Sequence, residues 1–124
     1  MPRFKFGKDQ RLLRASEFQE VFDLNTCKIS HPNWLLLAKF NTSYGSRLGL
    51  VIGKKNIPTA VQRNLVKRIA RETFRKQQFQ SPVDVVFLAR NGADKLSREK
   101  LTQIIQNSWV KLDARCKMLE VQGA

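Results

Sequence analysis

The amino-acid sequence predicts one domain of the α+β class, with helices and strands in the order α-β-β-β-α-β-α. The chain has 124 residues, of which 42% are hydrophobic, and this is enough for one modest core. Three segments carry apolar residues at helical spacing, and four others are short apolar runs typical of strands. No internal repeat, linker or low-complexity tract divides the chain, so we expect residues 1–124 to form one domain.

The first half of the chain begins with residues 1–14, which are polar and basic and are expected to be a flexible arm. A helix is then predicted from Ser16, the N-cap of a capping box closed by Gln19, to about Asn25. Its apolar stripe consists of Phe18, Val21 and Phe22. The strands predicted next are Cys27–His31, Trp34–Phe40 and Arg47–Ile52. Their short connections favour a hairpin or a small meander.

The second half begins with a capping box at Thr59, which opens a long helix from Ala60 to about Gln77. The run Val83–Ala89 is apolar almost throughout and is typical of a strand buried on both faces. Ser97 caps a last helix that is predicted to end near Arg115. The apolar stripe of this helix consists of Leu101, Ile104, Ile105 and Trp109.

The side chains that enzymes use are scarce in this chain. The one histidine, His31, lies in a turn-like segment with no visible partner, and the two cysteines have no metal-ligand spacing. Three carboxylates, Glu17, Glu20 and Asp23, share one predicted helix and could hold a metal, but a solvated face is the favoured interpretation. We therefore expect no catalytic residue, no metal site and no small-molecule substrate. Without a signal sequence or an apolar span we also expect a reduced, cytoplasmic protein with no membrane partner.

The charge of the chain indicates a polyanionic partner. Lys and Arg number 23 against 10 Asp and Glu, which gives a net charge of +13. From Leu24 to Arg71, both included, there are nine Lys or Arg residues and no acid. A solvated surface mixes the two signs, whereas an unbroken positive stretch suits a phosphate backbone.

The predicted helix 60–77 concentrates this charge on one face. At about 100° per residue, five cations and one amide share a single arc. They are Arg63, Asn64, Lys67, Arg68, Arg71 and Arg75. Three alternatives are weaker. The face could be merely solvated. A membrane-surface helix is disfavoured because the core needs its apolar arc, and a helix-turn-helix is disfavoured by the preceding strand and Pro58.

Sequence motifs in and around this helix resemble the bacterial ribonuclease P protein subunit. The motif consists of KKN at residues 54–56 and AVQRNLVKRIARETFR at residues 60–75. Other segments fit the family in the same order: Arg11-Leu12, residues 17–22, Arg47-Leu48-Gly49 and residues 82–86. The resemblance spans nearly the whole chain.

This resemblance implies a fold and a division of labour. It implies an α-β sandwich similar to a ribosomal-protein domain, with an unusual left-handed β-α-β crossover around the central helix. In such a ribonucleoprotein the RNA holds Mg²⁺ and cleaves the 5′ leader from precursor tRNA. The protein binds the RNA core and the leader, and raises the affinity for substrate and Mg²⁺. The implied partners are the catalytic RNA and the precursor tRNA.

The resemblance also implies roles for residues of this sequence. The residues implied to contact the catalytic RNA are Lys54, Lys55, Arg63, Asn64, Lys67, Arg68 and Arg71. Those implied to line or support the cleft for the leader are Arg11, Phe18, Phe22 and Trp34. Two positions depart from the family pattern: Leu65 replaces a usual second arginine, and Leu37 stands where an aromatic residue is common.

Reasoning from the residues alone leaves other classes open. For Phe18 and Phe22, ordinary core packing competes with a role in base stacking. A structural RNA-binding protein with no processing role would share the charge but would not need an aromatic cleft. A protein nuclease that acts alone is disfavoured because no acid-base set is present.

Overall fold

The computed structural model describes residues 10–42 and 45–122, and it has the α+β order that the sequence predicts. Its elements are α1 (Ala15–Leu24), β1 (Cys27–His31), β2 (Trp34–Phe40), β3 (Arg47–Val51), α2 (Ala60–Gln77), β4 (Val83–Ala89), η2 (Ala93–Lys95) and α3 (Arg98–Gln122). The first, second and fourth strands and α2 have the predicted bounds, and the third ends one residue earlier. The short 3-10 helix η2 was not expected.

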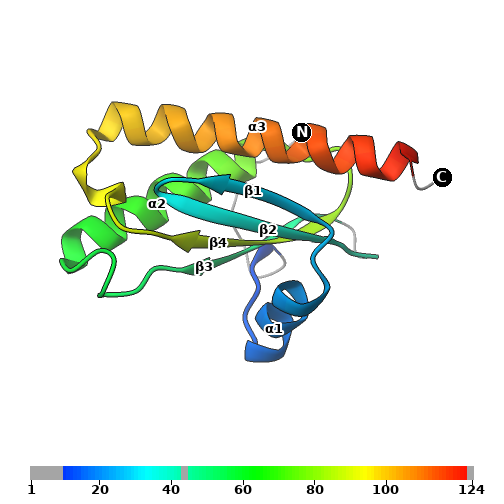
Figure 1. The fold of residues 1–124 in the computed structure, drawn as a ribbon, viewed down its shortest axis with the longest axis horizontal. Coiled ribbons are helices and arrows are strands. Elements are labelled where there is room, and N and C mark those ends of the chain that lie inside the picture. Colours follow the sequence, from blue (N-terminus) through cyan, green and yellow to red (C-terminus); the bar gives the residue numbers. More distant parts are fainter. Residues whose placement is uncertain (1–9, 43–44, 123–124) are drawn as a thin grey trace.

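The four strands form one sheet in the order β1-β2-β4-β3 (Figure 1). β1 and β2 form the expected antiparallel hairpin, and β2 pairs antiparallel with β4. The alternative of a meander is wrong for β3, because β4 lies between β2 and β3 and pairs with β3 in parallel. A parallel pair requires a crossover connection, and α2 is that crossover. β4 is therefore central, in agreement with its almost continuous burial.

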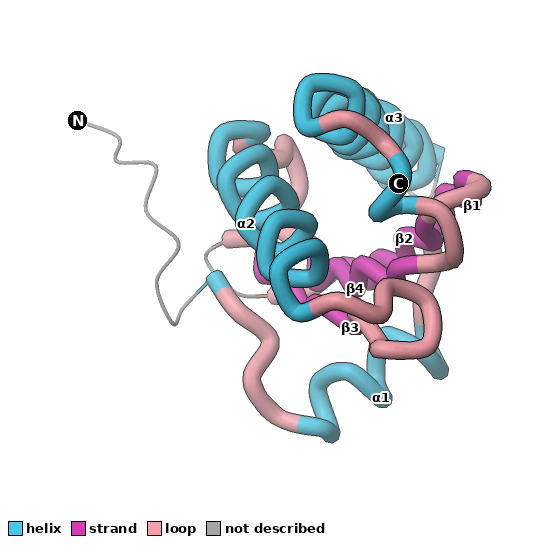
Figure 2. Tube along the Cα trace, turned by 90° about the vertical axis from the view of Figure 1, so that its left-hand side faces the viewer, coloured by secondary structure: helices cyan, strands magenta, loops and turns pink. Residues whose placement is uncertain are grey.

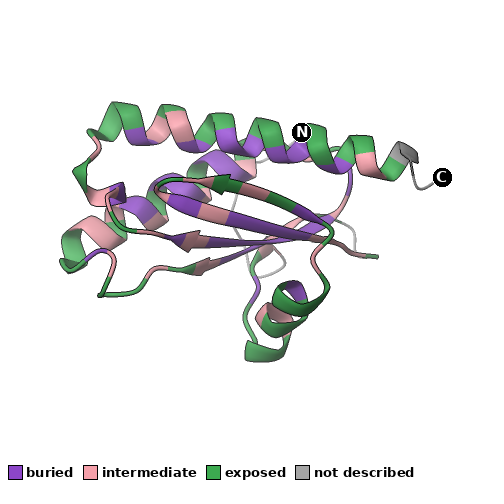
Figure 3. Ribbon diagram, in the orientation of Figure 1, coloured by how far each residue is buried: buried purple, intermediate pink, exposed green. Residues whose placement is uncertain are grey.

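The sheet lies between two layers of helices: α2 and α3 cover one face, and α1 covers part of the other (Figure 2). Alternate residues of the strands point to opposite faces. Trp34, Leu36 and Phe87 thus belong to the large core under α2 and α3. A smaller cluster of Leu12, Val21, Leu37 and Val86 lies under α1. Figure 3 shows the buried residues along the strands and on the sides of the helices that face the sheet.

Two buried indole groups are hydrogen-bonded within the large core. Trp34 Nε1 donates to Ser108 Oγ over 3.0 Å, and Trp109 Nε1 donates to Thr73 Oγ1 over 2.7 Å. The first bond joins β2 to α3 and the second joins α3 to α2. Because an unpaired buried donor is costly, these bonds fix how α3 lies on the sheet.

The N-terminal ends of α2 and α3 agree with the sequence prediction, and that of α1 differs from it. Thr59 Oγ1 accepts from Gln62 N at the start of α2, and Ser97 Oγ accepts from Lys100 N at the start of α3, as expected. The capping box predicted at Ser16 is wrong, because α1 begins at Ala15 and Glu17 accepts from two backbone N–H groups before it.

The last helix also continues beyond its predicted end. It runs through Gln122 rather than ending near Arg115. Cys116 is fully buried and Leu119 packs against the large core, so the apolar stripe continues past Leu112.

The predicted basic arm is in part a structural segment. Leu12 is buried, and its N–H donates to the carbonyl oxygen of Leu48 over 3.1 Å. Arg11 bridges to β3 at the same residue. Residues 10–14 therefore belong to the folded protein, because Leu12 supplies an apolar anchor, whereas residues 1–9 of the predicted arm lie outside the described residues.

Candidate nucleic-acid interface

The outward side of α2 presents a surface of cations, as its periodicity predicts. Its opposite side is buried in the core through Val66, Ile69, Ala70, Thr73 and Phe74. We define the α2 surface as Lys54, Lys55, Asn64, Lys67, Arg68 and Arg71. Of these residues, Lys67 and Arg71 are half-buried and the others are exposed. The helix thus separates an apolar face from a positively charged one.

The two lysines before α2 are held by a structured turn. The backbone N–H groups of Asn56 and Ile57 both donate to the carbonyl oxygen of Gly53, at 3.3 and 3.1 Å. Asn56 Nδ2 donates to Ala89 O at the end of β4, and Ile57 is fully buried. Because Asn56 and Ile57 hold the turn against the rest of the protein, Lys54 and Lys55 lie beside the start of α2.

Arg63 has a structural contact of its own. Its Nη1 atom donates to the carbonyl oxygens of Ile57 and Pro58, at 2.9 and 2.7 Å. These bonds tie the first turn of α2 to the loop before it. Arg63 thus supports the α2 surface, and its half-buried guanidinium adds positive charge there.

A cavity of about 230 Å³ lies between residues 11–13, β3 and α2. Its lining residues are Arg11, Leu12, Leu13, Phe18, Leu48, Leu50, Lys67 and Arg71. The cavity is therefore lined by residues predicted for both sites: Arg11 and Phe18 for the leader, and Lys67 and Arg71 for the catalytic RNA. Burial lowers the pKa of Arg71, and the positive charge of Arg11 lowers it further. Two cations held this close favour an anion between them.

The two phenylalanines of α1 have different surroundings. The Phe18 ring lies against β3 at Gly49, where a Cβ atom would be only 2.5 Å from Phe18 Cε2. Phe22 is 37% exposed, so its ring is not part of the core. On the same face of the sheet, Leu35 and Leu88 are half-buried and Val51 is exposed. This face therefore offers apolar and aromatic surface next to the cations of the cavity.

Trp34 does not line this surface. Its side chain is fully buried on the other face of the sheet, under α3, and its ring stacks on His31 with centroids 4.4 Å apart. The prediction for Trp34 is wrong because alternate residues of β2 face opposite ways, and Leu35 and Leu37 are the ones that point toward α1. Leu37 is buried beside Val21 and has no ring to stack on a base.

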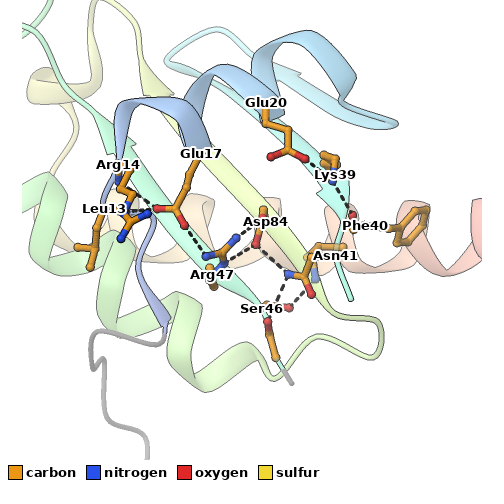
Figure 4. Close-up of polar contacts among 12 residues, drawn as sticks. Leu13, Arg14, Glu17, Glu20, Lys39, Phe40, Asn41, Ser46, Arg47 and Asp84 are labelled. Carbon is orange, nitrogen blue, oxygen red and sulfur yellow. Dashed lines mark hydrogen bonds and ion pairs between the residues drawn. The ribbon is translucent and has the colours of Figure 1, made fainter. Parts of the chain in front are cut away.

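Arg47 and Asp84 form the polar support of α1 (Figure 4). The sequence did not predict this role for either residue. Arg47 Nη2 and Nε donate to the two carboxylate oxygens of Asp84, at 2.7 and 2.8 Å, and its Nη1 donates to Glu17 Oε2 at 2.7 Å. Asn41 Nδ2 also donates to Asp84, over 2.8 Å. The available signal was an acid inside the apolar run of β4.

Glu17 joins this network to the start of α1. Its Oε1 atom accepts from the backbone N–H groups of Leu13 and Arg14, at 2.8 and 2.9 Å. These two bonds, together with Arg47, lower the pKa of the Glu17 carboxyl below its ordinary value. The hydrogen bonds and ion pairs of Arg47, first with Asp84 and then with Glu17, raise the pKa of its guanidinium above the ordinary value. α1 is thus fixed to the sheet by charge as well as by Val21.

The acids of α1 do not converge. Glu17 pairs with Arg47, Glu20 pairs with Lys39 over 3.2 Å, and Asp23 accepts from Gln19 Nε2. Among the described residues, no group of three or more histidine, cysteine or acidic side chains is placed to hold a metal ion. In the same part of the chain, no helix is both long and apolar enough to cross a membrane.

Comparison with known proteins gives one family. The family model described as Ribonuclease P matches residues 6–113. A protein of Saccharophagus degradans named Ribonuclease P protein component is 45% identical over 117 residues, covering 94% of this chain and 87% of that protein. One of the same name from Pseudomonas paraeruginosa is 45% identical over 108 residues, covering 86% and 80%.

Solved structures give the same result at the level of the fold. The RNase P protein of Staphylococcus aureus superposes with a TM-score of 0.68 at 26% identity, covering 83% of this chain and 91% of that one. The RNase P protein from Thermotoga maritima superposes with a TM-score of 0.62, also at 26% identity, covering 78% and 96%.

Proposed function

Because this chain belongs to the ribonuclease P protein family, we propose that it assists a catalytic RNA in removing the 5′ leader of precursor tRNA. The family is the protein subunit of a ribonucleoprotein endoribonuclease that cleaves tRNA precursors. In the proposed function this chain binds the core of the RNA with the α2 surface and the leader with α1 and the cavity. It thereby raises the affinity for substrate and for Mg²⁺.

The α2 surface supports the first contact. Lys54, Lys55 and Arg68 are exposed cations on a fixed turn and a rigid helix. Such an array suits a phosphate backbone of defined shape, because each Lys or Arg can neutralise one phosphate and release its counterion. Neighbouring like charges on a helix repel by a few tenths of a kcal/mol per pair, so a bound polyanion relieves this cost.

The cavity is the observation that carries the second contact. It is lined by two cations whose charges act on each other, Arg11 and Arg71, and by the aromatic ring of Phe18. A single strand offers phosphates and unstacked bases together, and such strands are bound by cations interleaved with aromatic rings. The exposed ring of Phe22 extends the aromatic surface beyond the cavity. A duplex, whose bases are stacked, would use only the cations.

The proposed effect on Mg²⁺ is indirect. When the catalytic RNA and the precursor approach each other, their phosphates repel, and the net charge of +13 on the protein offsets part of this repulsion. Because the protein offsets this repulsion, less Mg²⁺ is needed to neutralise phosphates, and more of the Mg²⁺ is available for the reaction. The Mg²⁺ ions of the holoenzyme are assigned mainly to the RNA.

The experiment is cleavage of a precursor tRNA by a bacterial ribonuclease P RNA at low Mg²⁺, with and without this protein. We expect strong stimulation by the protein and no cleavage by the protein alone. Tight RNA binding without stimulation would leave a structural RNA-binding protein, and cleavage without RNA would revive a protein nuclease. A leaderless precursor should gain less affinity from the protein than one with a leader, and an equal gain would contradict the assignment of α1 and the cavity.

A further inference from the structure

A second group of cations lies along β1, on the opposite edge of the sheet from α2. α3 packs over β1, whereas α2 packs beside β3 at the other edge (Figure 2). Arg115 Nη1 donates to the carbonyl oxygen of Lys28 over 2.8 Å, and Lys111 lies one turn earlier on the same side of α3. We define the β1 flank as Lys28, Lys111 and Arg115, whose side chains are all exposed.

Two further residues extend the positive charge to the hairpin end of β1. Arg90 Nη1 donates to Ser30 Oγ and to the carbonyl oxygen of His31, at 3.1 and 3.0 Å. Burial lowers the pKa of His31, and the positive charges of Lys111 and Arg90 lower it further. Cations from α3 and from the end of β4 therefore act on one imidazole, so the charge is continuous along the strand.

No acid among the described residues compensates the β1 flank. The ion pairs among the described residues join Lys39 to Glu20, Arg47 to Glu17 and Asp84, and Lys117 to Glu120, and none of them includes a residue of the flank. The acid of α3 nearest in sequence, Asp113, is buried and accepts from the backbone N–H of Gln80 on the other side of the helix. Cations with no acid beside them favour a bound anion.

We propose that the β1 flank is a second phosphate-binding surface, and that it holds the precursor strand upstream of the leader nucleotides bound at α1. This proposal rests on the proposed function. Lys28 and Ser30 alternate with the core residues of β1, which places them on the face of the sheet that carries α1. A strand that crosses this face from the β3 edge reaches the β1 flank after three strand spacings, or about 14 Å.

The position favours the precursor over the catalytic RNA. The α2 surface and the β1 flank lie at opposite edges of the sheet, so an RNA body seated on one does not extend to the other without crossing the face that carries α1. The leader is the RNA assigned to that face. Lysine and arginine contacts to phosphates carry no sequence preference, so the flank would hold leaders of any sequence.

The test is a variant of the full chain in which Lys28→Gln, Lys111→Gln and Arg115→Gln remove the flank. In the reconstituted holoenzyme we expect it to bind a precursor with a long leader about tenfold more weakly. Affinity for a precursor whose leader is cut to the nucleotides at α1 should not change. For the long leader, the slope of log K against log salt should fall by about 2, since each single-strand phosphate contributes about 0.7.

Two controls separate charge at the flank from charge in general. The variant Lys95→Gln, Arg98→Gln, Lys100→Gln changes the net charge equally, at exposed positions near the start of α3, and should leave both affinities unchanged. The variant Lys28→Gln, Lys111→Gln keeps the Arg115 hydrogen bond and should retain about two-thirds of the slope change. Equal losses for both leaders, or weaker binding of the catalytic RNA alone, would assign the flank to that RNA and overturn the proposal.

His31 gives a second readout, because it is the only histidine in the chain. A phosphate backbone on the flank adds negative charge beside it and raises its pKa. NMR titration of His31 in the full chain should therefore show a higher pKa with a long single-stranded leader, and little change with a short one. No shift with either leader would also refute the proposal. Failure of the unaltered protein to stimulate cleavage would instead contradict the proposed function.

Discussion

Substitution of Gly49 by alanine tests how the sheet seats α1. A Cβ atom there would lie 2.5 and 2.6 Å from Phe18 Cε2 and Cζ, and 3.1 Å from Leu12 Cδ1. Carbon atoms pack at roughly 3.5–4.0 Å, so the ring must move by about 1 Å. Overpacking of this kind costs about 1–3 kcal/mol. In a domain of this size, that loss of unfolding free energy lowers the Tm by roughly 4–12 °C.

The same substitution should separate the two proposed RNA contacts. Phe18 and Leu12 line the cavity, whereas the exposed cations of the α2 surface do not contact Gly49. We therefore expect Gly49→Ala to weaken binding of a precursor with a leader, and to leave binding of the catalytic RNA unchanged. Thermal unfolding and two binding titrations measure this. Gly53→Ala is the matched control, because no heavy atom lies within 4 Å of a Cβ there.

A double-mutant cycle decides whether Phe18 is the residue displaced. Leucine at position 18 lacks the two ring atoms that would clash, so Gly49→Ala should cost less in a Phe18→Leu background than in the unaltered chain. If the cost is the same in both backgrounds, the ring is not the obstacle. If leader binding survives Gly49→Ala while the Tm falls, the position of Phe18 does not matter for the leader.

Three further predictions concern charged residues. Arg47→Ala leaves Asp84 buried without its cation and should lower the unfolding free energy by about 3 kcal/mol in urea titrations; a loss below about 0.5 kcal/mol would contradict the role of this pair. Glu17 has a lowered pKa, so its contribution is present above its ordinary pKa of 4.5 and is lost as the pH falls through the lowered value. Glu17→Gln should thus make the Tm fall less steeply below about pH 4.5. If the Tm of this variant falls as steeply as that of the unaltered chain, Glu17 does not contribute in this way. Arg68→Ala should lower the slope of log K against log salt for binding of the catalytic RNA by about 1, whereas Arg98→Ala should leave it unchanged. An equal effect of both substitutions would mean that Arg68 makes no local contact with the RNA.

Local patterns predicted the elements well, and long-range pairing explains most of the differences. The bounds of β1, β2, β4 and α2 follow from alternation, apolar runs and the cap at Thr59, which involve neighbours in sequence. β3 pairs with residues 37 positions later in the chain, such as Arg47 with Asp84, through the packing of α2, and no local signal encodes this pairing. α3 continues because Cys116 is buried against the sheet, which its composition alone could not indicate.

The part of the candidate site that lies on a single helix could be predicted from the sequence. The α2 surface follows from helical periodicity and from the absence of acids from Leu24 to Arg71. The cavity could not be predicted from spacing, because it joins Arg11 to Arg71 across the edge of the sheet. Trp34 was misplaced because a strand residue and its neighbour face opposite sides, and only the register with β4 decides which side is the core.

The two proposed RNA contacts depend on different parts of the fold. α1 has ten residues, too few to be stable alone, and it holds its place through Val21 and the Arg47–Glu17 pair. α2 is anchored separately, through its buried face and the bond from Trp109 to Thr73. Loss of the Arg47 network should therefore release Phe18 and Phe22 while α2 stays folded. The capacity to bind the leader can then change, in evolution or in the laboratory, without loss of the surface assigned to the catalytic RNA.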